Sequence, residues 1–157
     1  MRGTIVEKTD DEVKCVRREL SRLDPWSFWT VPEAVRGADF SVVGSTGAFA
    51  VATCSLEGYV KSSATRLVVG DQAVSGLWGL RRAARKIHNR LLATGLDVRV
   101  EAIVCLTRAF PAPATSVRGV RAVHVDRLVE EIAERQRVLD PKRAERVAQK
   151  LRSAGHR

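Results

Sequence analysis

The chain has 157 residues, a size that suits one domain with its own hydrophobic core, and 45% of them are hydrophobic. No apolar run approaches the roughly 20 residues that a membrane-spanning helix needs. The 27 lysines and arginines exceed the 18 acidic residues, which gives a formal net charge of +9. This excess favours a polyanionic partner, nucleic acid before an anionic membrane; a basic surface that only aids solubility is the alternative.

The N-terminal segment predicts a helix. Residues 1–13 become acidic where a signal peptide would be apolar, so we expect a cytoplasmic protein. Thr9 and Glu12 have the spacing of a capping box, and apolar residues then recur at helical spacing as far as Leu23. Asp24-Pro25 is expected to end the helix, because the residue before a proline disfavours helical geometry.

An aromatic segment and several strands are predicted next. Trp26 and Trp29 are expected to pack over the first helix, with stacking on nucleic-acid bases as the alternative. Two apolar strands, about 39–44 and 48–54, flank a Gly-rich turn, and "GYVKSS" and "TRLVVG" predict further strands of an antiparallel meander. One face of the second strand carries only small residues, which would let a helix or another strand approach closely (Ala48, Ala50, Ala52 and Cys54).

A helix over about 77–94 carries the main binding signal. Apolar residues form its inner stripe, and its outer surface is basic with no acidic residue (Arg81, Arg82, Arg85, Lys86 and Arg90). Like charges four residues apart cost an isolated helix a few tenths of a kcal/mol per pair. A face of this kind opposes local stability, so it predicts a partner that supplies anions, and we expect that partner to be nucleic acid.

The remaining elements complete an α/β fold. "DVRVEAIVCLT" predicts a buried central strand, "GVRAVHV" a short strand, and Asp126 is expected to cap the helix that follows. Asp140-Pro141 opens a final helix whose basic residues would assist nucleic-acid binding (Lys142, Arg143, Arg146 and Lys150). The expected fold is one mixed central sheet, an antiparallel meander plus parallel strands, flanked by helices.

The run "ADFSVVGSTGAFAVATCSLEGYV" resembles a motif of the nuclease-related domain (NERD) family, Asp-x-x-x-x-Gly-x-x-Gly-x-(Phe)-x-x-acid-x-Lys. "EAIVCLT", "GVRAVHV" and "DRLVEEI" also fit the family in order and type. The resemblance covers about residues 10–135. It implies a fold like that of the PD-(D/E)XK nucleases, or restriction endonucleases, over residues 1–135, with 136–157 as an appended basic helix.

The resemblance also implies a site for Mg²⁺, which needs two close carboxylates and a lysine. Asp39 matches the first carboxylate, and Glu12 is placed like an acid of the family's first helix, although its capping box explains it equally well. The acid-x-Lys positions fall on Ala52-Thr53-Cys54, so the second carboxylate and the lysine are missing.

Other residues could replace the missing groups only with a change of chain path. Glu57 and Lys61 follow the motif, but an extended strand would carry Glu57 roughly 10 Å beyond Cys54. Glu101 on the buried strand is another candidate. Asp39 is therefore predicted to be the remnant of an incomplete site, and Mg²⁺ is expected only if the protein is active.

The leading expectation is a catalytically impaired domain of NERD-like fold that binds nucleic acid through backbone phosphates. One alternative is an active divalent-metal-dependent endonuclease that uses Asp39 with Glu12 or Glu57. A second is a protein-interaction module on a nuclease scaffold, and Val147, Ala148 and Leu151 of the final helix could support self-association. No other cofactor is expected.

Overall fold

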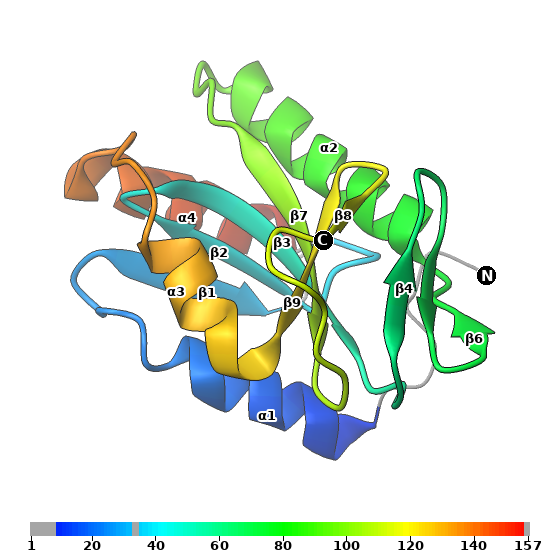
Figure 1. Ribbon diagram of the computed structural model, residues 1–157. Coiled ribbons are helices and arrows are strands. Elements are labelled where there is room, and N and C mark those ends of the chain that lie inside the picture. Colours follow the sequence, from blue (N-terminus) through cyan, green and yellow to red (C-terminus); the bar gives the residue numbers. More distant parts are fainter. Residues whose placement is uncertain (1–8, 33–34, 156–157) are drawn as a thin grey trace.

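The centre of the fold is a six-stranded mixed sheet in the order β1-β2-β3-β7-β9-β8 (Figure 1). The computed structural model describes residues 9–32 and 35–155. The strands are β1 (Phe28–Pro32), β2 (Phe40–Gly44), β3 (Gly47–Cys54), β7 (Val100–Leu106), β8 (Ser116–Val117) and β9 (Val120–His124). β7 pairs in parallel with β3 and β9, and the other neighbours are antiparallel. The α/β class with a mixed sheet is confirmed.

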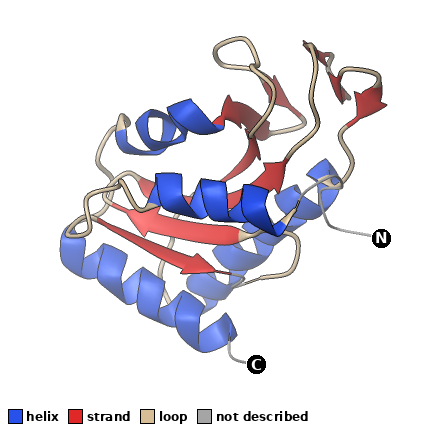
Figure 2. Cartoon of the chain, turned by 90° about the horizontal axis from the view of Figure 1, so that it is seen from below, coloured by secondary structure: helices blue, strands red, loops and turns tan. Residues whose placement is uncertain are grey.

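Helices cover both faces of this sheet, as the turned view shows (Figure 2). One layer contains α1 (Asp10–Leu20) and α3 (Leu128–Ala133), the latter preceded by the 3₁₀ turn η1 (Val125–Arg127). The other layer contains α2 (Leu77–Ala93) and α4 (Pro141–Gly155). Within the described residues, no helix is long and apolar enough to cross a membrane.

α1 begins where the sequence predicts and ends earlier. The Thr9 hydroxyl accepts a hydrogen bond from the Glu12 amide at 3.2 Å, as an N-cap does. The helix stops at Leu20, because the Ser21 hydroxyl donates to the Arg18 carbonyl at 2.6 Å and the chain turns there. The Asp24 carboxylate then accepts the amide of Trp26, so the predicted stop residue organises the following turn instead.

The two tryptophans do not pack as predicted. Trp26 is 83% exposed, and Trp29 on β1 packs partly against the sheet face that α2 and α4 cover. Phe28 is the aromatic residue that faces α1, since neighbouring strand residues point to opposite faces. Neighbouring side chains on β1 point to opposite faces of the sheet, and the sequence alone does not predict which of them faces α1.

β3 has the two unlike faces that its sequence predicts. The small side chains from Ala48 to Cys54 lie in the core beneath α2, whereas Phe49 and Val51 lie beneath α1. Small residues let α2 approach the sheet closely, and its predicted inner stripe is fully buried (Leu77, Leu80, Ala84, Ile87 and Leu91). This packing holds the opposite, basic surface of α2 toward solvent.

A second, three-stranded sheet corrects the expectation of a single sheet. It contains β4 (Val60–Ser62), β5 (Leu67–Val69) and β6 (Gln72–Ala73), all antiparallel. The chain leaves the main sheet at Gly58, whose φ is +134°, and a Cβ there would lie 2.8 Å from Cα of Gly70. The small sheet therefore stands beside the beginning of α2 (Figure 1).

α4 contributes to the core. Its apolar stripe is buried against β1 and β2 (Ala144, Val147, Ala148 and Leu151). The stripe expected to support self-association is thus inside the fold, so it offers no free surface. The Asp140 carboxylate accepts the Arg143 amide at 2.8 Å, which confirms the predicted start of the helix.

The Gly-rich turn between β2 and β3 is buried. The amides of Val138 and Leu139 both donate to the Ser45 carbonyl, at 2.7 and 3.0 Å. On the other side, the Thr46 hydroxyl donates to the Ile132 carbonyl at 2.6 Å. The linker between α3 and α4 therefore fixes this turn.

Candidate nucleic-acid interface

The outer face of α2 is exposed and positively charged. All five basic residues predicted for it are exposed (Arg81, Arg82, Arg85, Lys86 and Arg90). Among the described residues, Arg81, Arg82, Arg85 and Lys86 form no ion pair, and α2 itself contains no Asp or Glu. The cationic groups of these four residues are thus available to anions from outside the protein.

A cavity of about 420 Å³ lies along one flank of α2. Arg81, Arg85 and Arg99 are among the residues that line it, together with one acidic residue, Asp97. The ring of His88 donates from Nδ1 to the Val98 carbonyl at 2.7 Å, so it is fixed at one side of the cavity. With three arginines against one aspartate, the cavity favours an anion.

The β8–β9 turn extends this basic surface. Gly119 lies against Arg81, since a Cβ at that position would be 3.7 Å from the Arg81 Nε. The neighbouring Arg118 donates from Nε to the Thr65 carbonyl at 3.0 Å, which joins the turn to the β4–β5 turn. Figure 1 shows the two turns side by side next to α2.

A second cavity, of about 290 Å³, lies beyond this turn. Arg66, Arg118 and Trp78 contribute to its lining, together with apolar residues such as Leu67 and Leu77. The sequence did not single out Arg66, Arg118 or Trp78. The available signal was an arginine in each of two short turns, "SATRL" and "VRGV", but their proximity depends on tertiary structure.

The basic residues of α4 occupy a more mixed surface. Lys142, Arg143, Arg146 and Lys150 are all exposed, on the same side of the sheet as α2. Glu145 lies among them and is also exposed. α2 and α4 contact each other, so the two basic helices belong to one layer.

The carboxylate of Asp39 has a backbone partner. Its Oδ2 accepts the amide of Thr53 at 2.7 Å, and the Asp39 amide donates to the Val51 carbonyl at 2.8 Å. These bonds extend the β2–β3 ladder past its last registered pair, Phe40 and Val51. Asp39 therefore ties the start of β2 to β3 in this structure.

The positions that match the acid-x-Lys motif lie inside the protein. Ala52 and Cys54 are 2% and 0% exposed, in the core beneath α2. A carboxylate or an ammonium group at either position would be surrounded by apolar side chains, which is costly without a partner. The small residues there serve the close approach of α2.

Arg108 brings together two of the other acidic candidates. Its Nε donates to Oε1 of Glu12 at 2.8 Å, and its Nη1 lies 3.9 Å from Oε1 of Glu57. The Thr107 amide donates to the Cys54 carbonyl at 3.1 Å, which places Arg108 just beyond the end of β3. A guanidinium group thus lies between carboxylates that a metal site would have needed.

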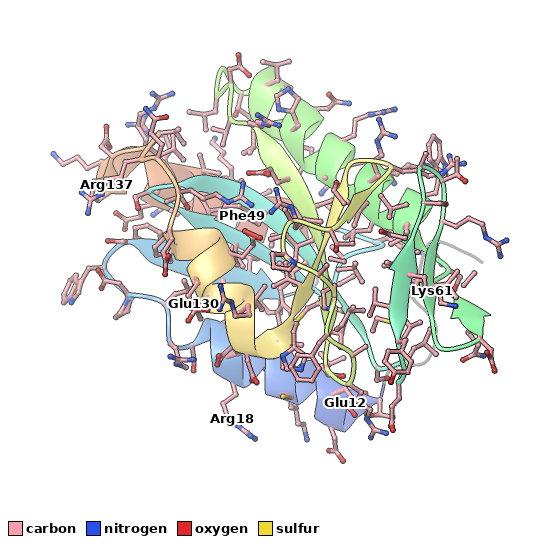
Figure 3. The ribbon with its side chains drawn as sticks, viewed as in Figure 1. Glu12, Arg18, Phe49, Lys61, Glu130 and Arg137 are labelled. Atoms are coloured by element: carbon pink, nitrogen blue, oxygen red, sulfur yellow. The ribbon has the colours of Figure 1, made fainter. Side chains whose placement is uncertain are left out.

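Glu101 and Lys61 are elsewhere. Glu101 pairs with Arg135, whose guanidinium carbon also lies 5.4 Å from the ring centre of Phe49. Lys61 is exposed on β4, away from Glu12 in the view of Figure 3. Among the described residues, no three His, Cys, Asp or Glu side chains are grouped so that they could hold a metal ion. The residues present therefore do not fit the Mg²⁺ site that the resemblance implies.

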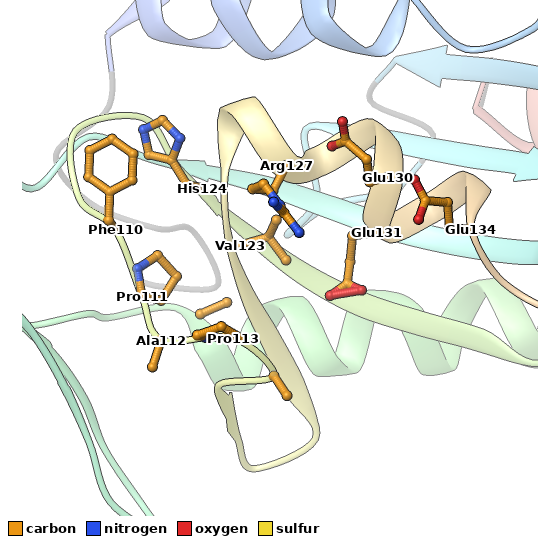
Figure 4. Close-up of a pocket in the computed structure, with 12 residues that line it drawn as sticks. Phe110, Pro111, Ala112, Pro113, Val123, His124, Arg127, Glu130, Glu131 and Glu134 are labelled. Carbon is orange, nitrogen blue, oxygen red and sulfur yellow. The ribbon is translucent and has the colours of Figure 1, made fainter.

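A third cavity, of about 430 Å³, lies on the opposite helical layer, beside α3 (Figure 4). Glu130, Glu131 and Glu134 line it with one cation, Arg127. The Phe110 ring stacks on His124 at one end, with ring centres 3.8 Å apart. This acidic lining is unsuited to a polyanion.

His124 also corrects a predicted helix cap. Its Nδ1 accepts the Asp126 amide at 3.1 Å, so His124, and not Asp126, caps the turn η1 that leads into α3. Asp126 lies inside η1, where its carboxylate is 3.6 Å from the same Nδ1.

Comparison with known proteins returns no relative: no family model, no curated protein and no solved structure matches the chain.

Proposed function

We propose that this chain is a nuclease-fold domain similar to the nuclease-related domain family, that it binds nucleic acid through α2, and that it cleaves nucleic acid poorly or not at all. The observation that carries the proposal is the α2 face, where Arg81, Arg82, Arg85 and Lys86 have no ion-pair partner among the described residues. Phosphate oxygens are the natural partners of such a face, and arginine binds them in a bidentate way.

The arrangement supports backbone contacts more than base recognition. Guanidinium groups on a helix and on two turns can follow a phosphate chain without reading the bases. Each neutralised phosphate contributes about −0.9 to the slope of log K against log salt on duplex DNA and about −0.7 on single strands.

The proposal is tested by fluorescence anisotropy with labelled duplex DNA, single-stranded DNA and RNA at several salt concentrations. We expect salt-sensitive binding. The double variant Arg81→Glu/Arg85→Glu should bind more weakly. Its slope of log K against log salt should be smaller in magnitude by about 1.5 to 2, because two phosphate contacts are lost. A slope near zero in the unmodified protein would overturn the proposal.

The matched control is Arg17→Glu/Arg18→Glu on α1. This variant makes the same change in net charge, and both residues are exposed on the other face of the sheet. Arg18 lies at the bottom of the view in Figure 3, whereas α2 lies at the top. Equal loss of binding in the two double variants would mean that total charge matters and that α2 has no special role.

The catalytic part of the proposal rests on Glu12, Arg108 and Asp39. Glu12 forms an ion pair with Arg108, and the Asp39 carboxylate accepts a hydrogen bond from the Thr53 amide. Incubation of the bound nucleic acids with Mg²⁺ or Mn²⁺, followed by gel electrophoresis, should show intact strands. Metal-dependent cleavage that disappears in Asp39→Asn would establish the alternative, an active nuclease.

A further inference from the structure

We infer that the preferred ligand is single-stranded nucleic acid, and that an unpaired base stacks on Trp78 in the cavity that Arg66 and Arg118 also line. This inference deepens the proposed function and rests on it. It concerns the second cavity, about 290 Å³ in volume. The residues that line this cavity lie outside the motif of residues 38–60.

Trp78 is placed as a stacking surface. It is 55% exposed, although its neighbours Leu77 and Leu80 on α2 are buried in the core. Trp78 lines a cavity whose other walls include Leu67 and Val74. An aromatic ring that is half open in an apolar cavity can cover the face of a base, and every base has such a face.

Two arginines line the same cavity as Trp78. Arg66 and Arg118 both line the cavity, and each belongs to a hairpin turn. The Nε bond from Arg118 to the Thr65 carbonyl fixes one turn against the other. Arg118 and Gly119 have φ of +53° and +81°, as the two central residues of a tight hairpin turn often do, so the turn between Val117 and Val120 fixes the position of Arg118.

The Trp78 cavity continues into the basic surface already described. Arg118 lines one cavity and the next residue, Gly119, lines the other, where it lies against Arg81. Trp78, Arg81 and Arg85 are three and four residues apart, so they follow one side of α2 over about 10 Å. A single strand could thus place a base on Trp78 while its phosphates meet Arg81 and Arg85.

The same geometry disfavours duplex DNA as the better ligand. Bases in a duplex are paired and stacked, so an indole reaches a base face only when the base is unpaired. A major groove about 12 Å wide just admits one helix with its side chains. The β8–β9 turn lies against Arg81 on α2, so it would hinder entry of this side of the helix into the groove.

The experiment compares a 20-nucleotide single strand with a 20-base-pair duplex, in the unmodified protein and in Trp78→Ala, Trp78→Phe and Trp26→Ala. Trp26 is the matched control, because it is 83% exposed and lies between α1 and β1. We expect tighter binding of the single strand. Trp78→Ala should weaken that binding about 5- to 150-fold, as loss of one base–aromatic stack does, and should leave duplex binding nearly unchanged.

Two further readings separate stacking from a structural effect. Trp78→Phe keeps an aromatic face and should recover most of the single-strand affinity. Tryptophan fluorescence should be quenched by the single strand in the unmodified protein and in Trp26→Ala, and much less in Trp78→Ala. Arg66→Glu, an exposed substitution in a turn, should also weaken single-strand binding more than duplex binding.

The outcomes distinguish a failure of this inference from a failure of the proposed function on which it rests. Equal affinity for the two ligands, or equal effects of Trp78→Ala and Trp26→Ala, would overturn the inference while salt-sensitive binding through α2 still stood. No binding of either ligand at low salt would overturn both.

Discussion

Asp39 illustrates how a residue that matches a catalytic motif can have a structural partner. Its carboxylate holds the Thr53 amide, and this bond continues the pairing of β2 with β3. We expect Asp39→Ala to lower the free energy of unfolding by about 1–3 kcal/mol, because a buried amide loses a charged acceptor. Asp39→Asn keeps an acceptor oxygen and should cost less than half as much. Urea denaturation measures both, and equal losses would contradict this role.

A second residue-scale prediction concerns Gly44 at the end of β2. It pairs with Phe28 of β1, and a Cβ at Gly44 would lie 2.0 Å from Cδ1 of the Phe28 ring. We expect Gly44→Ala to destabilise the protein by about 1–3 kcal/mol through overpacking. In the double variant with Phe28→Ala the two costs should be less than additive, because the clashing ring is gone. Additive losses would show that the ring is not the cause.

At the scale of the element, the like charges on α2 lower the stability of this helix in the free protein. Arg82 and Lys86 are four residues apart, so they repel each other in the free protein. Arg82→Glu replaces this repulsion with a favourable Glu–Lys pair, and we expect about 0.5 kcal/mol of added stability. The melting temperature should rise by about 1–2 °C while nucleic-acid affinity falls. A fall in both quantities would mean that Arg82 stabilises the free helix in another way.

The elements also show what the sequence could predict. Helical spacing predicted α2 and its buried stripe, and alternation predicted the two faces of β3, because both patterns are local. The same reasoning did not separate β4, β5 and β6 from the main sheet, since pairing partners depend on the path of the chain at Gly58. Arg66, Arg118 and Trp78 were missed for this reason, as two turns and a helix bring them together.

At the scale of the whole molecule, α4 closes the core over β1 and β2. Its buried residues cover an apolar sheet surface that includes Val31 and Val43. We expect a chain of residues 1–135 to lose cooperative unfolding and to bind hydrophobic dyes, because this surface would be exposed. Circular dichroism and dye fluorescence would measure the change. An unchanged unfolding midpoint would show that the helix is only an appendage.

The main sheet also has short outer strands. β8 has two residues, and β1 has five and ends at Pro32, which has no amide hydrogen to donate. A polyanion would hold many copies of this protein close together, and exposed strand edges at such local concentrations invite aggregation. Because both outer strands are short, they present few unpaired backbone groups to a neighbouring copy. Under the proposed function, crowding along one nucleic-acid strand would therefore stay reversible, and salt would displace each copy.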